Sequence, residues 1–139
     1  MAIRLFYQQT RYRLRTSAQT IAWIKRVIKQ EGATAGNITF VICTDAVLLP
    51  MNQAYLKHNT LTDIITFQYH RKGEPLEGEV YISIDRVKEN ARQFNVRPAD
   101  ELHRVMIHGV LHLIGYSDKT AAAKKRMRRK EDTCLSLRK

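Results

Sequence analysis

The sequence predicts a single domain that contains both β-strands and α-helices. The chain has 139 residues, of which 44% are apolar, enough for one core of ordinary size. Short β-branched runs alternate along the chain with segments whose apolar residues recur at helical spacing. No linker or repeat divides the chain, so we expect residues 1–139 to form one domain.

The first third of the chain predicts a strand, a helix and a second strand. Residues 1–15 mix apolar and basic side chains, a pattern that predicts an edge strand with outward basic positions. A helix should follow, with Thr16 or Ser17 as its N-cap, and end at Gly32. Its apolar positions are Ile21, Ile24, Val27 and Ile28. The β-branched run from Ile38 to Cys43 predicts a buried strand.

The middle of the chain predicts a short helix and a hairpin. Thr44 or Asp45 is placed to cap a helix that carries Leu48, Met51 and Tyr55. Pro50 interrupts this pattern, so the helix either begins late or bends there. Residues 62–69 and 78–84 resemble two strands joined by a polar loop, and we expect them to pair as a hairpin.

The last third of the chain predicts three helices. Asp85 is placed to cap the first, with Val87, Ala91 and Phe94 facing inward. Pro98 opens the second, which should run through two histidines. The third extends from Lys119 to about Leu137. Its packed stripe consists of Met127, Cys134 and Leu135, and most of its other positions are basic or polar.

A pattern with the spacing of metal ligands lies in the second of these helices. His108 and His112 are one helical turn apart, close enough for two imidazole nitrogens to share one ion. Gly115 follows where a left-handed residue commonly ends a helix, and the reversed chain would bring Asp118 towards the two histidines. The spacing predicts a metal site formed by His108, His112 and Asp118.

The spacing H-x-x-x-H-x-x-G-x-x-D matches the zinc-binding helix of the metzincins except in two places. Gly109 stands where zinc proteases carry the glutamate that acts as general base, which argues against peptide hydrolysis by that mechanism. Asp118 stands in place of a third histidine, and carboxylate oxygen is also a zinc ligand.

The charge of the chain predicts a polyanionic partner. There are 24 Lys and Arg residues against 13 Asp and Glu residues, a formal net charge of +11. The first thirty residues contain basic side chains and no acidic one, and a second basic cluster lies at residues 124–130. We therefore expect binding to a polyanion that is strongly dependent on salt.

Cysteine use and hydropathy indicate the compartment. The two cysteines, Cys43 and Cys134, give no disulfide framework, so a reducing cytoplasm is the simpler expectation. No apolar run approaches the length needed to cross a membrane. We therefore expect a soluble cytoplasmic protein without a membrane partner.

Several motifs together resemble the YbeY family of metal-dependent endoribonucleases over about residues 35 to 137. They are residues 108–118, Asn52-Gln53-Ala54-Tyr55, Thr62-Asp63-Ile64-Ile65-Thr66-Phe67, Gly78-Glu79-Val80-Tyr81-Ile82-Ser83, and Met127 with Glu131. The resemblance implies a compact α+β domain in which a small mixed sheet of about four strands is covered by helices, with one zinc per chain in a cleft beside the sheet. It also implies 3′-end maturation of small-subunit (16S) ribosomal RNA and ribosome quality control, with RNA and the small ribosomal subunit as partners and no DNA.

The sequence departs from the common family pattern at two positions. Asp118 replaces the usual third histidine, and Leu56 follows Tyr55 where most members have an arginine. Lys57 and His58 are adjacent substitutes for the missing cation. Lysine offers a point charge and does not form the bidentate contact that guanidinium makes to a phosphate. Lys57 is therefore a candidate catalytic residue, but it is not equivalent to the arginine that it would replace.

Together with the metal-ligand spacing, the resemblance implies metal-assisted hydrolysis of a phosphodiester, with catalysis through His108, His112 and Asp118. The nucleophile is either water activated by the metal or the 2′-hydroxyl of the substrate. Two alternatives remain: a non-catalytic RNA-binding ribosome-assembly factor with a structural zinc, and another zinc-dependent hydrolase. A structural site needs a fourth protein ligand, and neither cysteine lies at a ligand spacing from the histidines.

Overall fold

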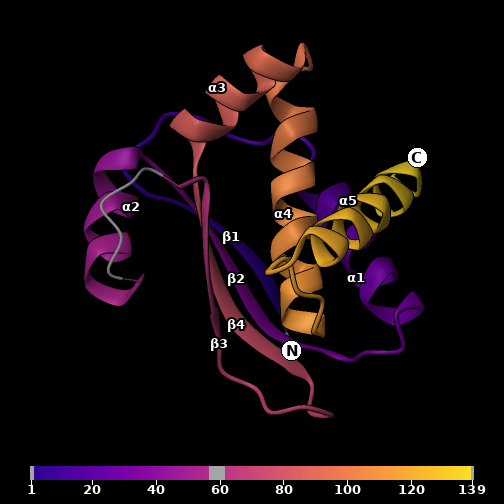
Figure 1. Ribbon diagram of the computed structural model, residues 1–139. Coiled ribbons are helices and arrows are strands. Elements are labelled where there is room, and N and C mark those ends of the chain that lie inside the picture. Colours follow the sequence, from indigo (N-terminus) through magenta and orange to yellow (C-terminus); the bar gives the residue numbers. More distant parts are fainter. Residues whose placement is uncertain (1, 57–61, 139) are drawn as a thin grey trace.

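A four-stranded mixed sheet with the strand order β1-β2-β4-β3 runs through the computed structural model, which describes residues 2–56 and 62–138 (Figure 1). The strands are β1 (Ile3–Tyr7), β2 (Ala35–Cys43), β3 (Ile64–Gln68) and β4 (Leu76–Ser83). β1, β2 and β4 are parallel, and β3 pairs antiparallel with β4. The predicted α+β class, the mixed sheet, the edge strand β1 and the hairpin β3–β4 are confirmed.

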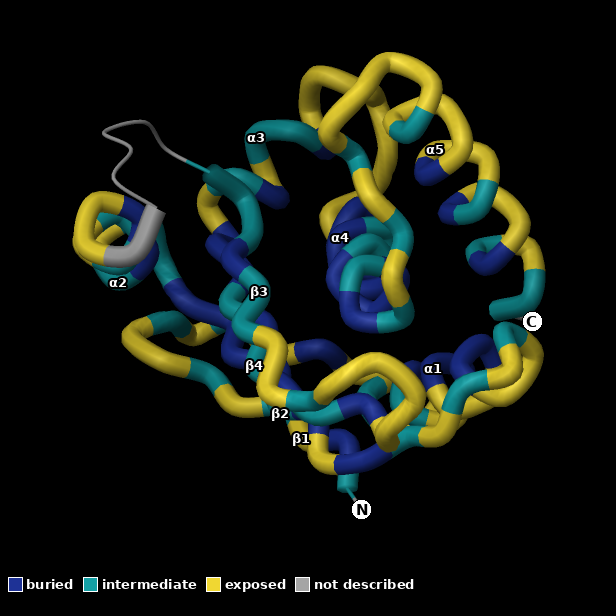
Figure 2. The backbone as a smooth tube through the Cα atoms, turned by 60° about the horizontal axis from the view of Figure 1, so that its bottom comes forward, coloured by how far each residue is buried: buried dark blue, intermediate teal, exposed yellow. Residues whose placement is uncertain are grey.

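Helices cover both faces of this sheet. They are α1 (Ser17–Gln30), α2 (Asp45–Met51), α3 (Ile84–Phe94), α4 (Pro98–Ile114) and α5 (Ala121–Ser136), and a π-helical turn, η1 (Asn52–Leu56), follows α2. Figures 1 and 2 show α1, α4 and α5 on one side of the sheet and α2 on the other. No helix among the described residues is long and apolar enough to span a membrane.

The main core lies between the sheet and α4. Phe40, Val80 and Leu111 are fully buried there, and Figure 2 shows α4 enclosed while the outer side of α5 is exposed. A smaller core of Val41, Leu48 and Ile65 lies beneath α2 on the opposite face. The end of β2, residues 40–43, is buried on both faces and is a continuous apolar run. In β4, buried and partly buried residues alternate up to Ile82.

The helix predicted after residue 44 begins at Asp45, with Thr44 as its N-cap, so it does not begin late. Pro50 lies inside its last turn. Proline cannot donate the backbone hydrogen bond that would continue the α-helical ladder, and the chain widens into the π-helical turn η1 directly after Met51.

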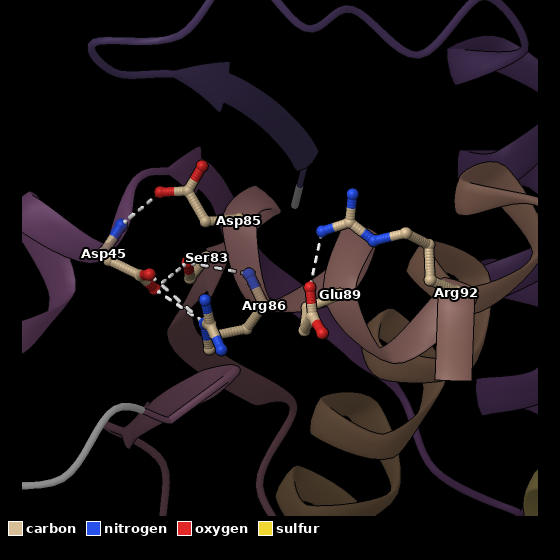
Figure 3. A network of polar contacts seen from close by, with 6 residues as sticks. All are labelled: Asp45, Ser83, Asp85, Arg86, Glu89 and Arg92. Atoms are coloured by element: carbon tan, nitrogen blue, oxygen red, sulfur yellow. Dashed lines mark hydrogen bonds and ion pairs between the residues drawn. The ribbon is translucent and has the colours of Figure 1, made fainter. Parts of the chain in front are cut away.

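The N-terminus of α3 differs from the prediction. Its N-cap is Ser83, whose hydroxyl accepts from the Arg86 N–H at 3.4 Å. The Asp85 carboxylate instead accepts from the Asp45 N–H at 2.9 Å, at the start of α2. The Asp45 carboxylate in turn accepts from Ser83 Oγ at 2.7 Å and pairs with Arg86 at 3.2 Å (Figure 3). This network joins α2 to α3.

Candidate metal centre

Helix α4 presents His108 and His112 on one face. Their ring centroids are 4.7 Å apart, as expected for residues separated by one turn. Gly115 ends the helix with φ +125°, and its N–H donates to the carbonyls of Leu111 and His112. The chain then reverses, and Asp118 Oδ2 lies 3.3 Å from Nε2 of each histidine. The structure thus brings together the three residues that the sequence singles out.

These three side chains fit a zinc ion. One ligand atom from each of His108, His112 and Asp118 lies within 4.8 Å of the other two, and two imidazole nitrogens with one carboxylate oxygen form a common zinc donor set. No fourth histidine, cysteine or acidic residue joins the group within residues 2–56 and 62–138. The group therefore has the three-ligand composition of zinc sites that keep one position open.

A buried carboxylate from α5 orients His108. The Nδ1 atom of His108 lies 2.6 Å from Glu131 Oε2, and Glu131 is only 5% exposed. Because a carboxylate accepts, Nδ1 carries the hydrogen and Nε2 is left as the donor atom towards a metal. Arg104 donates to Glu131 Oε1 at 2.9 Å and to Asp132 Oδ1 at 2.6 Å. Arg104 therefore holds the Glu131 carboxylate through the oxygen that does not contact His108.

The electrostatics of the group follow from these contacts. Burial lowers the pKa of His108, but the hydrogen bond and charge of Glu131 outweigh it, so the pKa is raised overall. Burial raises the pKa of Asp118, yet His112 and His108 hold it below its usual value. Asp118 is therefore ionised at neutral pH, as a metal ligand must be.

The group opens into a cleft of about 1020 Å³ between β3, α3, α4 and α5. Its cationic lining residues are Arg104, Lys119, Lys124 and Arg128. Arg104 is paired with acidic residues, whereas Lys119, Lys124 and Arg128 form no ion pair with any described residue. These three cations are therefore available to an anionic ligand.

A further carboxyl group lines this cleft at the start of β3. Asp63 is largely enclosed, and this burial raises its pKa above the ordinary value. The charge of His108 opposes the rise only in part. In the sequence, Asp63 and Glu131 stand out only as members of family motifs, and no role is predicted from the sequence for either. The spacing of Met127 and Glu131, four residues apart, placed both on one helical face, but nothing in that spacing indicated that Glu131 contacts His108.

Gly109 is explained by close packing of α4 on the sheet. A Cβ at this position would lie 2.9 Å from Val80 Cγ1 and 3.1 Å from Ile64 Cδ1. The glutamate that zinc proteases carry after the first histidine therefore has no room here. This agrees with the argument against a protease drawn from the sequence.

Lys57, the further candidate catalytic residue, falls outside the described residues, as does His58, so the catalytic role of Lys57 stays a prediction. His103 faces a different side of α4, as expected, and is buried between α1 and α4. Its Nε2 lies 2.8 Å from Thr20 Oγ1, and its Nδ1 lies 2.6 Å from the Ala99 carbonyl oxygen.

Comparison with known proteins supplies the family. The family model described as "Endoribonuclease YbeY" matches residues 6–138. The chain is 46% identical over 134 residues to Endoribonuclease YbeY of Cytophaga hutchinsonii, covering 96% of this chain and 94% of the relative. It is 46% identical over 132 residues to the protein of the same name from Flavobacterium psychrophilum, covering 95% and 94%. The solution structure of TM1509 from Thermotoga maritima is similar, with a TM-score of 0.70 and 25% identity, covering 99% of this chain and 89% of that one.

Proposed function

We propose, because this chain belongs to the YbeY family of endoribonucleases, that its cleft cleaves single-stranded RNA with one zinc ion per chain. Membership makes the chain a hydrolase of the nuclease class with RNA as its substrate. The observation that carries the proposal is the three-donor group of His108, His112 and Asp118, which opens into a cleft lined by cations.

His108, His112 and Asp118 would hold the zinc. When bound, zinc supplies Lewis acidity towards a phosphate oxygen and activates water. Glu131 fixes the tautomer of His108 through the Nδ1 contact at 2.6 Å. Lys119, Lys124 and Arg128 are placed to bind the backbone phosphates, and they position the strand without selecting its sequence. Lys57 is proposed as a further cation for the substrate.

We further propose that the substrate is the 3′ region of small-subunit ribosomal RNA, that the ribosome or its small subunit is the partner, and that the protein acts in ribosome quality control in the cytoplasm. What supports this is the match to the YbeY family and the net charge of +11. A surface of this sign favours an RNA polyanion, and its attraction is screened by salt.

A non-catalytic assembly factor with a structural zinc is the alternative from another functional class. Its metal would need four protein ligands, whereas the group on α4 has three among the described residues. Another zinc-dependent hydrolase is a third candidate. The packing around Gly109 argues against the protease form of it.

Metal analysis combined with a cleavage assay tests the proposal. The wild-type chain should bind one zinc and cut a single-stranded RNA, and His112→Ala should lose both properties. His70→Gln is the matched control, because His70 lies outside the metal group and contacts the backbone at Glu77 and Leu113. A wild-type chain that binds one zinc and RNA without cutting it would favour the assembly factor instead.

A further inference from the structure

Phe94, the last residue of α3, is exposed where its helical spacing predicts an inward side chain. Val87 and Ala91 of the same predicted stripe are buried, but Phe94 is 53% exposed. Val96, two residues later, is 44% exposed. Two of the large exposed apolar side chains in the described part of the chain therefore lie in one turn. Exposed apolar groups that gather in this way mark binding sites more often than isolated ones do.

The backbone around Phe94 is held in a defined turn. Asn95 adopts the left-handed conformation, with φ 55°. The N–H groups of Asn95 and Val96 donate to the carbonyls of Arg92 and Ala91 at 3.2 and 2.9 Å. These are the bonds of a Schellman-type helix end. The aromatic ring is thus presented from a fixed backbone, and a fixed surface loses little entropy when a ligand binds.

Phe94 lies between the metal cleft and a second hollow. It lines the 1020 Å³ cleft together with His108, His112 and Asp118, and it also lines an adjoining hollow of about 470 Å³. Val96, Leu135 and Arg138 lie only in the second hollow. Arg128 lines both, and its guanidinium carbon is 5.7 Å from the centroid of the Phe94 ring. An aromatic ring, with a cation over one of its faces, therefore lines the same cleft as the three-donor group.

We propose that Phe94 is a stacking platform for one nucleobase of the RNA strand, and that Arg128 binds a phosphate of the same stretch. This inference rests on the proposed function. A single strand presents bases and phosphates in alternation, and sites for it combine aromatic faces with cations. A base within a duplex already stacks on its neighbours and has no free face for Phe94. The platform therefore gives this cleft a physical reason to prefer single strands.

Steady-state cleavage of a single-stranded RNA of about ten nucleotides tests the platform. Phe94→Leu removes the aromatic face and keeps an apolar side chain, and it should raise KM by roughly tenfold, with kcat little changed. Phe94→Tyr keeps the ring and should retain the wild-type KM. Zinc content and thermal stability should be the same in all three proteins. Equal KM values for wild type and Phe94→Leu would overturn the inference.

A substrate series with one abasic nucleotide at successive positions identifies the contacted base. One position should raise KM for the wild type but not for Phe94→Leu, because the variant has no platform to lose. Arg128→Gln should reduce the dependence of log affinity on log salt by about 0.7, while Phe94→Leu leaves that slope unchanged. If every abasic position affects both proteins equally, Phe94 contacts no base. A wild-type chain that neither binds nor cuts RNA would contradict the proposed function itself, which is a separate result.

Discussion

The contact between His108 and Glu131 leads us to expect that metal binding depends on a residue outside the three-donor group. We predict that Glu131→Gln lowers zinc affinity by about 10- to 100-fold, because the charge that orients His108 and raises the basicity of its ring is lost. Competition with a chromophoric chelator measures this directly. Asp132→Asn is the matched control: Asp132 contacts the same Arg104 but its side chain is 58% exposed, so its loss should leave affinity nearly unchanged. Equal affinities for wild type and Glu131→Gln would show that Glu131 only packs.

The close packing of Val80 against Gly109 leads to a second prediction, in which alanine does not give its usual stabilisation of a helix. Replacing glycine by alanine inside a helix normally stabilises it by about 1 kcal/mol. Here the new Cβ would press on the buried Val80 at 2.9 Å, and overpacking a core costs about 1–3 kcal/mol. We therefore expect Gly109→Ala to leave the free energy of unfolding unchanged or lower it by up to about 2 kcal/mol.

Urea unfolding measures the effect of Gly109→Ala, and Gly109→Glu extends the test. The longer side chain should destabilise the protein more than alanine does, because α4 cannot move off the sheet without exposing its core. A rise of about 1 kcal/mol for Gly109→Ala, the ordinary helix value, would show that α4 does not pack against Val80 as described.

At the residue scale, the sequence was sufficient for the three members of the metal group and insufficient for their surroundings. His108 and His112 are neighbours because they are one helical turn apart. Gly115 indicates the end of the helix, after which the chain reverses and brings Asp118 beside the histidines. All of this is local in the chain. Glu131 reaches His108 from 23 residues away, and Phe94 is exposed although its spacing matches Val87 and Ala91. Both depend on how helices pack, which no short pattern specifies.

At the scale of elements, His103 of α4 contacts Thr20 of α1 and is buried between the two helices, so we expect their packing to be sensitive to pH. Burial lowers the pKa of His103, although the Ala99 carbonyl and Asp100 oppose this, and Arg138 acts with burial. Nδ1 donates to the Ala99 carbonyl, so the neutral ring leaves Nε2 to accept from the Thr20 hydroxyl. A lowered folded-state pKa means that the unfolded chain binds this proton more readily.

The free energy of unfolding should therefore include a contribution from His103 that is fully present above the ordinary histidine pKa of about 6.5 and is lost as the pH falls below it. Thermal unfolding of wild type and His103→Gln across this range checks the prediction. His108 has a raised pKa and acts in the opposite sense, but it is common to both proteins, so the difference between their pH profiles isolates His103. Parallel profiles would contradict the prediction.

The elements themselves were largely predictable. Helix α1 begins and ends where Thr16 and Gly32 indicate, and the hairpin β3–β4 forms from adjacent segments. The errors lie at helix ends. Asp85 and Ser83 are both good cap residues, and Asp85 was the wrong choice because its carboxylate is engaged by α2 instead. The parallel pairing of β2 with both β1 and β4 joins segments distant in the chain and had no local signal.

At the scale of the whole molecule, the net charge of +11 should dominate association with RNA. We predict that affinity for a single-stranded RNA falls steeply between low and moderate salt, because every phosphate that is neutralised releases condensed counterions. Binding isotherms at several salt concentrations give the slope, and a neutral crowding agent at matched osmolality is the control. A flat response would mean that the basic surface is not the binding surface.

The position of α5 also bears on when the site can form. A ribosome makes a chain from its N-terminus onward, so both histidines are made before Glu131 and Arg128. The Trp23 indole of α1 donates to the Cys134 carbonyl of α5 at 2.8 Å across 111 residues of sequence. Because this contact joins the start of the chain to α5, it can form only after α5 has been made and has left the exit tunnel. A nascent chain that ends before Thr120 already carries His108, His112 and Asp118, but it lacks the helix that orients His108 and walls the cleft. The cleft is therefore complete only after α5 has been made and has docked, because α5 supplies both Glu131 and part of the cleft wall.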